Sequence, residues 1–245
     1  MSGIEDTDTV AYFDNHVPEY SVGRLAHPAA FISENGGASA SVVDIGCGAG
    51  NTLAYMGDAT GATELCGIDV SANLLERTHE EVPGCETHLG SILDTELLDA
   101  IGRERFDFAV IAAVLHHLIG RTRRESHRRA ELAVTNALEL LKPGGHLIVV
   151  DEGFSPPRAV DAVFYVKKAV TRLTSRRVGI LGEWNNIGPP VVSYYTNEQL
   201  VEMVQARGAA ELVNQVREPA HLGRGVNILL SKTDITLISR KRVLR

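Results

Sequence analysis

Short apolar segments alternate with helical segments along this chain, and this alternation limits the fold more than any other feature. Such alternation is typical of a parallel sheet that is covered by helices on both faces. The predicted strands are 41–45, 64–68, 86–89, 106–111 and 146–150, and the predicted helices are 25–35, 50–58, 71–81 and 123–141. A K-P-G-G turn at 142–145 is expected to separate the last helix from the fifth strand. The pattern predicts a doubly wound α/β fold with a mostly parallel sheet.

The C-terminal part of the chain is expected to complete this sheet. Thr196 and Gln199 have the spacing of a capping box, so a helix should begin near Asn197. Two further strands are predicted at 211–216 and 235–239. Residues 1–24 and 152–195 lie outside the alternation, and long connections of this kind often close over a ligand.

Charge, hydropathy and cysteine usage exclude several classes of protein. The formal net charge of −7 argues against a general nucleic-acid-binding surface. No apolar run is long enough for a membrane span, and the start M-S-G-I-E-D is unlike a signal or transit peptide. Cys47, Cys66 and Cys85 form no C-x-x-C pair. We therefore expect a cytoplasmic protein with no metal site, no membrane contact and no nucleic-acid partner, and its oligomeric state is not predicted.

A glycine-rich turn joins the first predicted strand to the helix that follows it. In V-V-D-I-G-C-G-A-G-N-T, the residues Gly46, Gly48 and Gly50 form G-x-G-x-G. Glycines at such a turn let the backbone approach a ligand without a Cβ in the way. Dinucleotide-binding proteins share this turn, so it does not identify the ligand by itself.

Two acidic residues narrow the choice of ligand. Asp69 ends the second strand in G-I-D-V-S, where a carboxylate can accept hydrogen bonds from ribose hydroxyls. Asp44 lies two residues before Gly46, inside the first strand. A carboxylate there would repel a pyrophosphate, but it would attract the ammonium group of an amino-acid cofactor.

These motifs resemble those of the class I S-adenosylmethionine-dependent methyltransferases. D-I-G-C-G-A-G with G-I-D-V-S is similar to the family's first motif and ribose-binding acid, and L-L-K-P-G-G-H-L-I-V-V-D is similar to a later motif. The resemblance implies a Rossmann-like seven-stranded sheet with an antiparallel last strand. It also implies S-adenosylmethionine as cofactor, S-adenosylhomocysteine as product and a small-molecule methyl acceptor, possible types being an anionic compound or a sugar or natural-product intermediate.

The expected single domain over 1–245 has four parts. They are an N-terminal cap (1–24), a cofactor-binding core (25–151), a substrate lid (152–195) and a C-terminal helix with strands (196–245). By resemblance, the loop glycines pack against the methionine part of the cofactor, and Ser91 replaces an acid that commonly lies near the adenine. The predicted cofactor residues are Asp44, Gly46, Gly48, Gly50, Asp69, Val70, Ser91, Ile92 and Ala112.

A histidine pair follows the fourth strand, and an acid follows the fifth. Histidine titrates near neutrality, and a carboxylate neighbour can fix its tautomer. Similar pairs occur in family members that methylate sugars or other natural products. We predict His116 as a general base and Asp151 as its partner, while the alternative is that His116 only packs against the cofactor.

The insertion and the N-terminal segment supply the predicted acceptor contacts. Residues 157–178 read as a helix in which Lys168 and Arg172 share one face. This basic face either binds an anionic acceptor or is solvated or an oligomer contact. The predicted acceptor-binding residues are Tyr12, Tyr20, His117, Lys168, Arg172, Trp184 and Tyr194.

Two other functions remain open at this point. A nicotinamide-dependent oxidoreductase would share the glycine loop and Asp69, although Asp44 and the histidine pair disfavour it. A noncatalytic S-adenosylmethionine-binding protein would share every cofactor contact.

Overall fold

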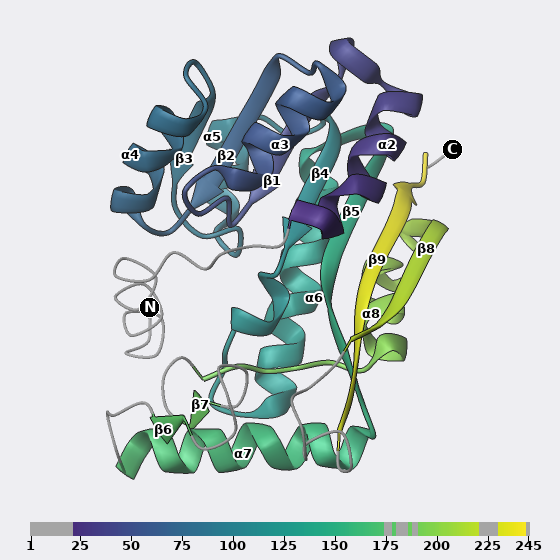
Figure 1. Ribbon diagram of the computed structural model, residues 1–245. Helices are drawn as coiled ribbons and strands as arrows, with labels where there is room; N and C mark the ends of the chain where they lie inside the picture. Colours follow the sequence, from purple (N-terminus) through teal and green to yellow (C-terminus); the bar gives the residue numbers. More distant parts are fainter. Residues whose placement is uncertain (1–21, 174–177, 180–185, 188–190, 221–229, 244–245) are drawn as a thin grey trace.

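The computed structural model describes residues 22–173, 178–179, 186–187, 191–220 and 230–243 (Figure 1). These residues form one large mixed sheet with helices on both sides and a small hairpin beside the helix α7 (Figure 1). The strands are β1 (Ser41–Ile45), β2 (Glu64–Asp69), β3 (Glu86–Leu89), β4 (Phe106–Ala112), β5 (Leu141–Ser155), β6 (Val178–Gly179), β7 (Asn186–Ile187), β8 (Ala210–Ala220) and β9 (Ser231–Lys241). The α-helices are α2 (Ala26–Asn35), α3 (Asn51–Thr60), α4 (Ala72–Glu81), α5 (Thr95–Ile101), α6 (Arg123–Leu140), α7 (Pro157–Leu173) and α8 (Asn197–Val204). The short 3-10 helices are η1 (Val22–Leu25), η2 (Gly37–Ser39), η3 (Leu115–His117) and η5 (Ala206–Gly208).

The seven strands of the large sheet have the order β3-β2-β1-β4-β5-β9-β8. The strands from β3 to β5 are parallel, whereas β9 is antiparallel to both β5 and β8. The predicted seven-stranded, mostly parallel sheet with an antiparallel last strand is therefore confirmed. β5 also gives the sheet its longest run of paired residues, because it follows β9 from His146 to Ser155.

Side chains on the two faces of the sheet build two apolar layers. On one face, Val42, Phe108 and Ile148 pack with residues of α2 and α3. On the other face, Val43 and Leu147 pack with residues of α5, α6 and α8. The strands alternate in this way because successive side chains of a strand point to opposite faces.

Side-chain caps explain where several of these helices begin. The Ser71, Asp94 and Thr122 side chains accept hydrogen bonds from backbone N–H groups in the first turns of α4, α5 and α6. Thr196 and Gln199 form the predicted capping box at α8. These caps satisfy N–H groups that have no partner inside their own helix.

The region around β5 differs from the sequence-based prediction in two respects. The K-P-G-G segment does not separate α6 from a short strand, because β5 begins at Leu141, directly after α6, and pairs there with Phe106. β5 also continues past Asp151 to Ser155, because β9 supplies antiparallel partners for these residues. Asp151 therefore lies inside a strand and not after it.

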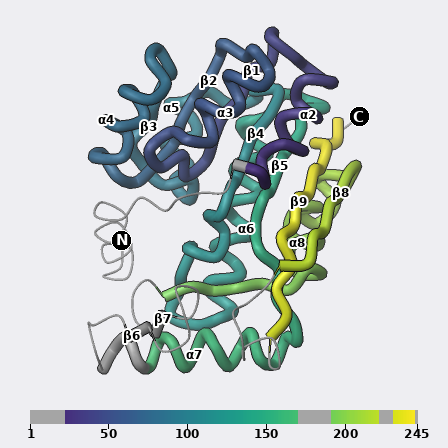
Figure 2. The backbone as a smooth tube through the Cα atoms, in the orientation of Figure 1, coloured from purple at the N-terminus to yellow at the C-terminus, as the bar shows by residue number. Residues whose placement is uncertain are grey.

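The insertion after β5 contains the long helix α7. Figure 2 shows this helix running crosswise beyond the end of β5, next to the start of α6. An ion pair of 3.1 Å joins Arg123 Nε of α6 to Asp161 Oδ1 of α7. Phe164 and Val160 of α7 are buried, and Val160 packs with Phe154 of β5. Within the described ranges, no helix has the length and apolar character needed to cross a bilayer.

Candidate functional site

The strand order reverses between β1 and β4, and the predicted site residues follow these two strands. In an open α/β sheet, ligands bind beyond the carboxyl ends of the strands at such a switch point. The glycine loop follows β1, and η3 follows β4. The two segments are in contact, because a Cβ added at Gly46 would lie only 2.5 Å from Cγ2 of Val114. The predicted cofactor and catalytic residues therefore start from one edge of the sheet.

The glycine loop has a left-handed backbone at each of its three glycines. The φ angles are +74° at Gly46, +56° at Gly48 and +88° at Gly50. Other residues adopt this region only at a cost of about 1–2 kcal/mol. A Cβ at Gly48 would have no described atom within 4 Å. Gly48 is thus the loop position at which the backbone borders open space.

Asp44 is a buried carboxylate whose charge is not compensated by the residues around it. Its side chain is 1% exposed, and neither oxygen has a hydrogen-bond partner among the described residues. Burial, with a smaller contribution from the charge of Asp69, raises the pKa of Asp44 to about 8. A buried carboxylate of this kind is costly unless a cationic partner is present. Asp44 is therefore suited to a bound ammonium group.

Asp69 links the glycine loop to the next helix. Its Oδ2 accepts a hydrogen bond from Gly48 N and its Oδ1 accepts one from Ser71 N, both at 2.9 Å. A carboxylate at the end of this strand is the type of group that accepts hydrogen bonds from the ribose hydroxyls of a ligand. Val70, the next residue, is 47% exposed although it is apolar.

The residues predicted to lie near the adenine follow β3. Ser91 is half-buried, and its hydroxyl accepts a hydrogen bond from Leu93 N. Ile92 is buried, and its carbonyl accepts a 2.7 Å bond from Asn136 of α6. Ala112 is the last residue of β4 and is half-buried. The adenine contact at these positions stays a prediction.

His116 and Asp151 are brought together in the interior. Their side chains come from η3 and β5, and His116 Nδ1 lies 2.7 Å from Asp151 Oδ1. His116 is 8% exposed and Asp151 is 1% exposed. Burial alone lowers the pKa of His116, but the Asp151 carboxylate, together with Glu152, outweighs it, so the pKa is raised. The pair has the geometry of a base and its orienting acid.

Two predicted acceptor residues surround this pair. The His117 ring lies 4.2 Å from the His116 ring, and the Tyr194 ring lies 5.8 Å from it, between centroids. Burial lowers the pKa of His117 well below its usual value, and the charges of His116 and Lys167 add to this effect. Burial raises the pKa of Tyr194, so both groups are neutral near pH 7.

Lys168 has a different position from the one expected. Its side chain is 8% exposed, and its Nζ donates hydrogen bonds to the carbonyls of Gly120 at 2.9 Å and Arg121 at 3.1 Å. The ammonium group thereby joins α7 to the loop before α6, which corrects the expectation that it faces an acceptor. The neighbouring Lys167 is the lysine near the site, with its Nζ 5.6 Å from the centre of the Tyr194 ring.

Four predicted acceptor residues are not tested by these contacts. Tyr12, Tyr20 and Trp184 lie outside the described residues. Arg172 lies in α7, but its side chain is also outside them. Their roles stay predictions.

A cluster of four charged side chains beside Asp151 was missed by the sequence analysis. Arg24 of η1 and Lys232 of β9 form ion pairs with Glu152 of β5 and Asp234 of β9. The only sequence signal is the alternation K-x-D at 232–234, which places both side chains on one face of a strand. The partners of that pair come from distant segments, so spacing could not reveal them.

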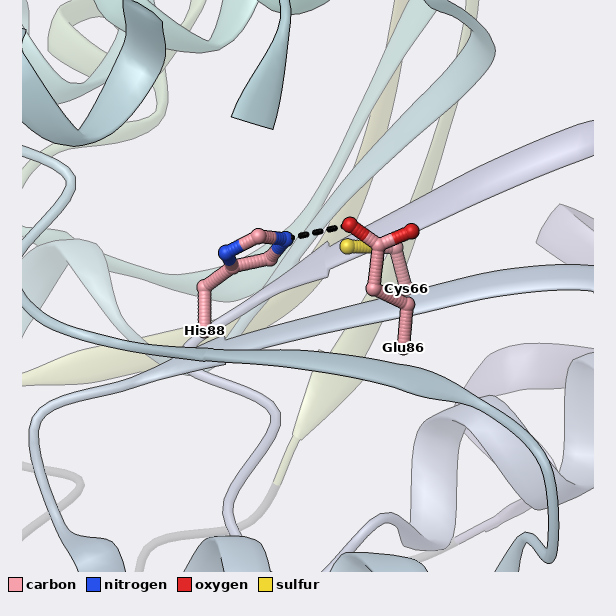
Figure 3. Close-up of side chains that lie close together, drawn as sticks. All are labelled: Cys66, Glu86 and His88. Carbon is pink, nitrogen blue, oxygen red and sulfur yellow. Dashed lines mark hydrogen bonds and ion pairs between the residues drawn. The ribbon is translucent and has the colours of Figure 1, made fainter. Parts of the chain in front are cut away.

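A second group of polar side chains lies on β2 and β3, where Figure 3 shows Cys66, Glu86 and His88 close together. All three offer atoms of the type that binds metal ions. However, Glu86 pairs with Arg105 at 2.5 Å and with His88 at 2.6 Å. Burial raises the pKa of the Cys66 thiol to about 12, whereas Arg105 lowers that of Glu86 to about 2. The arrangement is accounted for by these ion pairs.

Comparisons with known proteins identify a methyltransferase domain and its fold. The family model described as "Methyltransferase domain" matches residues 43–147. A search of curated proteins gives no match. The chain is 17% identical to N-methyltransferase NodS from Bradyrhizobium japonicum WM9, solved with S-adenosylhomocysteine, with a TM-score of 0.58 over 96% of this chain and 98% of that one.

Two other solved structures have the same fold over almost their whole length. Geranyl diphosphate C-methyltransferase from Streptomyces coelicolor A3(2) is 12% identical, with a TM-score of 0.62 and 99% of both chains covered. The cyclase SpnF is 15% identical, with a TM-score of 0.61, and 98% of this chain and 96% of that one are covered. Likeness at such identities establishes the fold only.

Residues 43–147 match a methyltransferase domain, and the sheet topology is that of the solved methyltransferases. The neighbour NodS holds S-adenosylhomocysteine, the product of S-adenosylmethionine. The residues present here fit this cofactor: Asp44 is an unpartnered buried carboxylate for the ammonium, and Gly48 borders open space in the loop. Asp69, held by the N–H groups of Gly48 and Ser71, is a carboxylate of the type that accepts hydrogen bonds from ribose hydroxyls.

Proposed function

We propose that this methyltransferase acts on an O–H or N–H group of a small-molecule acceptor, with His116 as the general base and Asp151 as its orienting partner. The observation that carries this proposal is the buried 2.7 Å hydrogen bond between His116 Nδ1 and Asp151 Oδ1. A protonated hydroxyl or ammonium is a poor nucleophile, so a base at this edge of the sheet would assist the reaction.

The hydrogen bond determines which ring nitrogen can act. A carboxylate only accepts, so Nδ1 of His116 holds the ring proton and donates it to Asp151. In the neutral ring, Nε2 then carries the lone pair that takes a proton from the acceptor. Because the Asp151 charge also raises the pKa of His116, the ring is a stronger base than an ordinary histidine.

The remaining residues position the reactants. S-adenosylmethionine supplies an electrophilic methyl group on a sulfonium, and much of the rate of such a displacement comes from alignment. Asp44 would bind the ammonium and Asp69 the ribose, while Ser91 and Ile92 would contact the adenine. Val70 and Ala112 are proposed as further cofactor contacts. The loop glycines would approach the methionine part.

His117 and Tyr194 are the acceptor contacts that the geometry supports best, because both rings lie against the His116 ring. Lys167, with its ammonium near the Tyr194 ring, offers a positive charge at the same place. An acceptor with an aromatic or apolar body and an anionic group would match these side chains. Arg172, Tyr12, Tyr20 and Trp184 remain proposed contacts.

A second candidate is a protein that binds S-adenosylmethionine but catalyses another reaction. The neighbour SpnF is named a cyclase, so the same fold is not restricted to methyl transfer. The His116–Asp151 pair would serve proton transfer in either case.

The test has two stages. First, S-adenosylhomocysteine and nicotinamide cofactors are compared by calorimetry, and we expect binding of the former only. Second, the protein is incubated with methyl-labelled S-adenosylmethionine and a panel of small hydroxyl, amine and carboxylate compounds. Transfer of label to an oxygen or nitrogen, reduced in His116→Ala, supports the proposal. Cofactor binding with transfer that is undiminished in His116→Ala would contradict the role of the base.

A further inference from the structure

The charged cluster beside the catalytic pair lies on the opposite face of β5 from His116. Asp151 and Glu152 are consecutive residues of this strand, so their side chains point to opposite faces. Asp151 contacts His116, whereas Glu152 contacts the cluster. The strand therefore separates a buried base on one side from a half-buried ion-pair network on the other.

The network is compact and holds two positive and two negative groups. Glu152 Oε1 lies 2.5 Å from Lys232 Nζ and 3.5 Å from Arg24 Nη1. Asp234 Oδ1 lies 3.6 Å from Arg24 Nη2 and 3.7 Å from Lys232 Nζ. Each side chain is less than a third exposed, with 29% at Asp234 as the largest value. Because these charges are partly buried, dissolved salt screens their interaction only weakly.

The network is joined to the catalytic pair through one peptide group. Arg24 Nη2 donates a hydrogen bond to the carbonyl of Asp151 at 2.5 Å. On the other side of the same peptide, the N–H of Glu152 donates to Asp151 Oδ1 at 2.7 Å, the oxygen that also bonds His116. The guanidinium group of Arg24 thus contacts both the Asp151 carbonyl and the Glu152 carboxylate.

Asp151 lies where such support is needed. The pairing of β4 with β5 ends at Ala112 and Val150, and the next bridge on that side joins Gly153 to Tyr195, so Asp151 and Glu152 are paired only with β9. A peptide at this point has lost one of its two strand neighbours, and its orientation depends on the remaining contacts.

We infer that Arg24 is a positioning residue: it fixes the peptide between Asp151 and Glu152 and thereby holds the Asp151 carboxylate on Nδ1 of His116. The inference deepens the proposed function, because it concerns the base named there. Arg24 bonds to the Asp151 carbonyl and pairs with Glu152 and Asp234, so it acts on His116 through Asp151.

The positioning effect of Arg24 and the effect of its charge shift the pKa of His116 in opposite directions, so they can be distinguished. Asp151 contacts the His116 ring from β5, the charges of Glu152 in β5 and Arg24 in η1 also act on it, and the rings of His117 and Tyr194 pack against it. The positive charge of Arg24 by itself lowers the pKa of His116. Loss of that charge alone would therefore raise this pKa, whereas loss of the bond to Asp151 would lower it.

The experiment is an NMR titration of the histidine rings, recorded on the ¹⁵N-histidine-labelled protein without cofactor or acceptor. The variants are Arg24→Ala and Arg24→Lys, and the control is Arg103→Ala, an exposed arginine paired with Asp99 and Glu139. Lysine keeps the charge but cannot form the planar two-pronged contact. Circular dichroism reports whether each variant is folded. If Arg24→Ala does not fold, the test is made with Arg24→Lys alone.

We expect both Arg24 variants to lower the titration midpoint of His116 by about one pH unit and to lose the single Nδ1–H tautomer, while the control leaves both unchanged. A midpoint that rises in Arg24→Ala and does not move in Arg24→Lys would show that Arg24 acts only as a charge. An unchanged midpoint in both would show a purely structural role. The readout needs no methyl transfer, so a failed base assignment would be recognised separately in the transfer assay.

Discussion

Nδ1 of His116 lies 2.7 Å from Oδ1 of Asp151, and this hydrogen bond joins the turn after β4 to the middle of β5. Both partners are buried, so the bond is shielded from water and is stronger than its exposed equivalent. It fixes the ring orientation before any acceptor binds. The His116 ring is also packed between His117 and Tyr194, which limits its other rotamers.

Replacement of the base should reduce turnover without affecting the cofactor. We expect His116→Ala to slow methyl transfer by about 10²–10⁴-fold, because the acceptor proton then has no positioned base. The affinity for S-adenosylhomocysteine should remain, since Asp44 and Asp69 are untouched. His79→Ala, at an exposed histidine of α4, is the control. Turnover that survives in His116→Ala would mean that positioning alone suffices.

The same pair should make stability depend on pH in a defined direction. The pKa of His116 is raised in the folded state above its ordinary value of 6.5. The ion pair therefore stabilises the fold fully below about pH 6.5, and this contribution is lost as the pH rises through the folded-state pKa. Thermal unfolding of the protein and of His116→Gln should differ most near pH 6 and least near pH 9. A stability difference that is larger near pH 9 than near pH 6 would show that His116 is neutral in the folded protein.

Alanine substitutions at two glycines can distinguish the cost of backbone strain from an effect on cofactor binding. Gly48 and Gly37 both have φ of +56°, and a Cβ at either would have no described atom within 4 Å. Alanine at each position should therefore cost a similar ~1–2 kcal/mol of stability. Only Gly48→Ala should weaken S-adenosylhomocysteine binding in calorimetry, because only Gly48 belongs to the cofactor loop. Equal affinity of both variants for S-adenosylhomocysteine would show that the ligand does not contact Gly48.

Much of the fold could be predicted because local signals and the global pattern agree. The capping box at Thr196 and the glycine turn at Gly46 both mark element boundaries by local chemistry. The extension of β5 to Ser155 could not be predicted, because it depends on pairing with β9, more than seventy residues later in the chain. Strand length is set by such distant partners as much as by local sequence.

Some residues of the candidate site could also be predicted from the sequence, and others could not. The order of strands and polar residues was enough to predict that His116 and Asp151 meet, although Asp151 lies inside β5 and not after it. It was not enough for Lys168, because the direction of a helical side chain depends on where the helix docks, and α7 docks with Lys168 against the Gly120 carbonyl. Arg24 was missed for a related reason, since its partners come from β5 and β9.

Asp44 is proposed to bind the ammonium group of S-adenosylmethionine. Because burial raises the pKa of Asp44 to about 8, the free protein holds this carboxyl largely protonated at pH 7. An ammonium group favours the ionised form, so cofactor binding should release a proton. Asp44→Asn should lose this release. Its gain in stability over the wild-type free protein should grow as the pH rises from about 4, where the unfolded carboxyl ionises, to about 8, the folded-state pKa, and stay constant above it.

The most direct test is calorimetric titration of S-adenosylhomocysteine into the protein and into Asp44→Asn at pH 7, in two buffers that differ in ionisation enthalpy. For the wild-type protein we predict binding with proton release. For Asp44→Asn we predict no proton release and an affinity about 10–100-fold lower, since a hydrogen bond to a charged group is worth roughly 1.5–3 kcal/mol. Equal affinity in a folded Asp44→Asn variant would contradict the account.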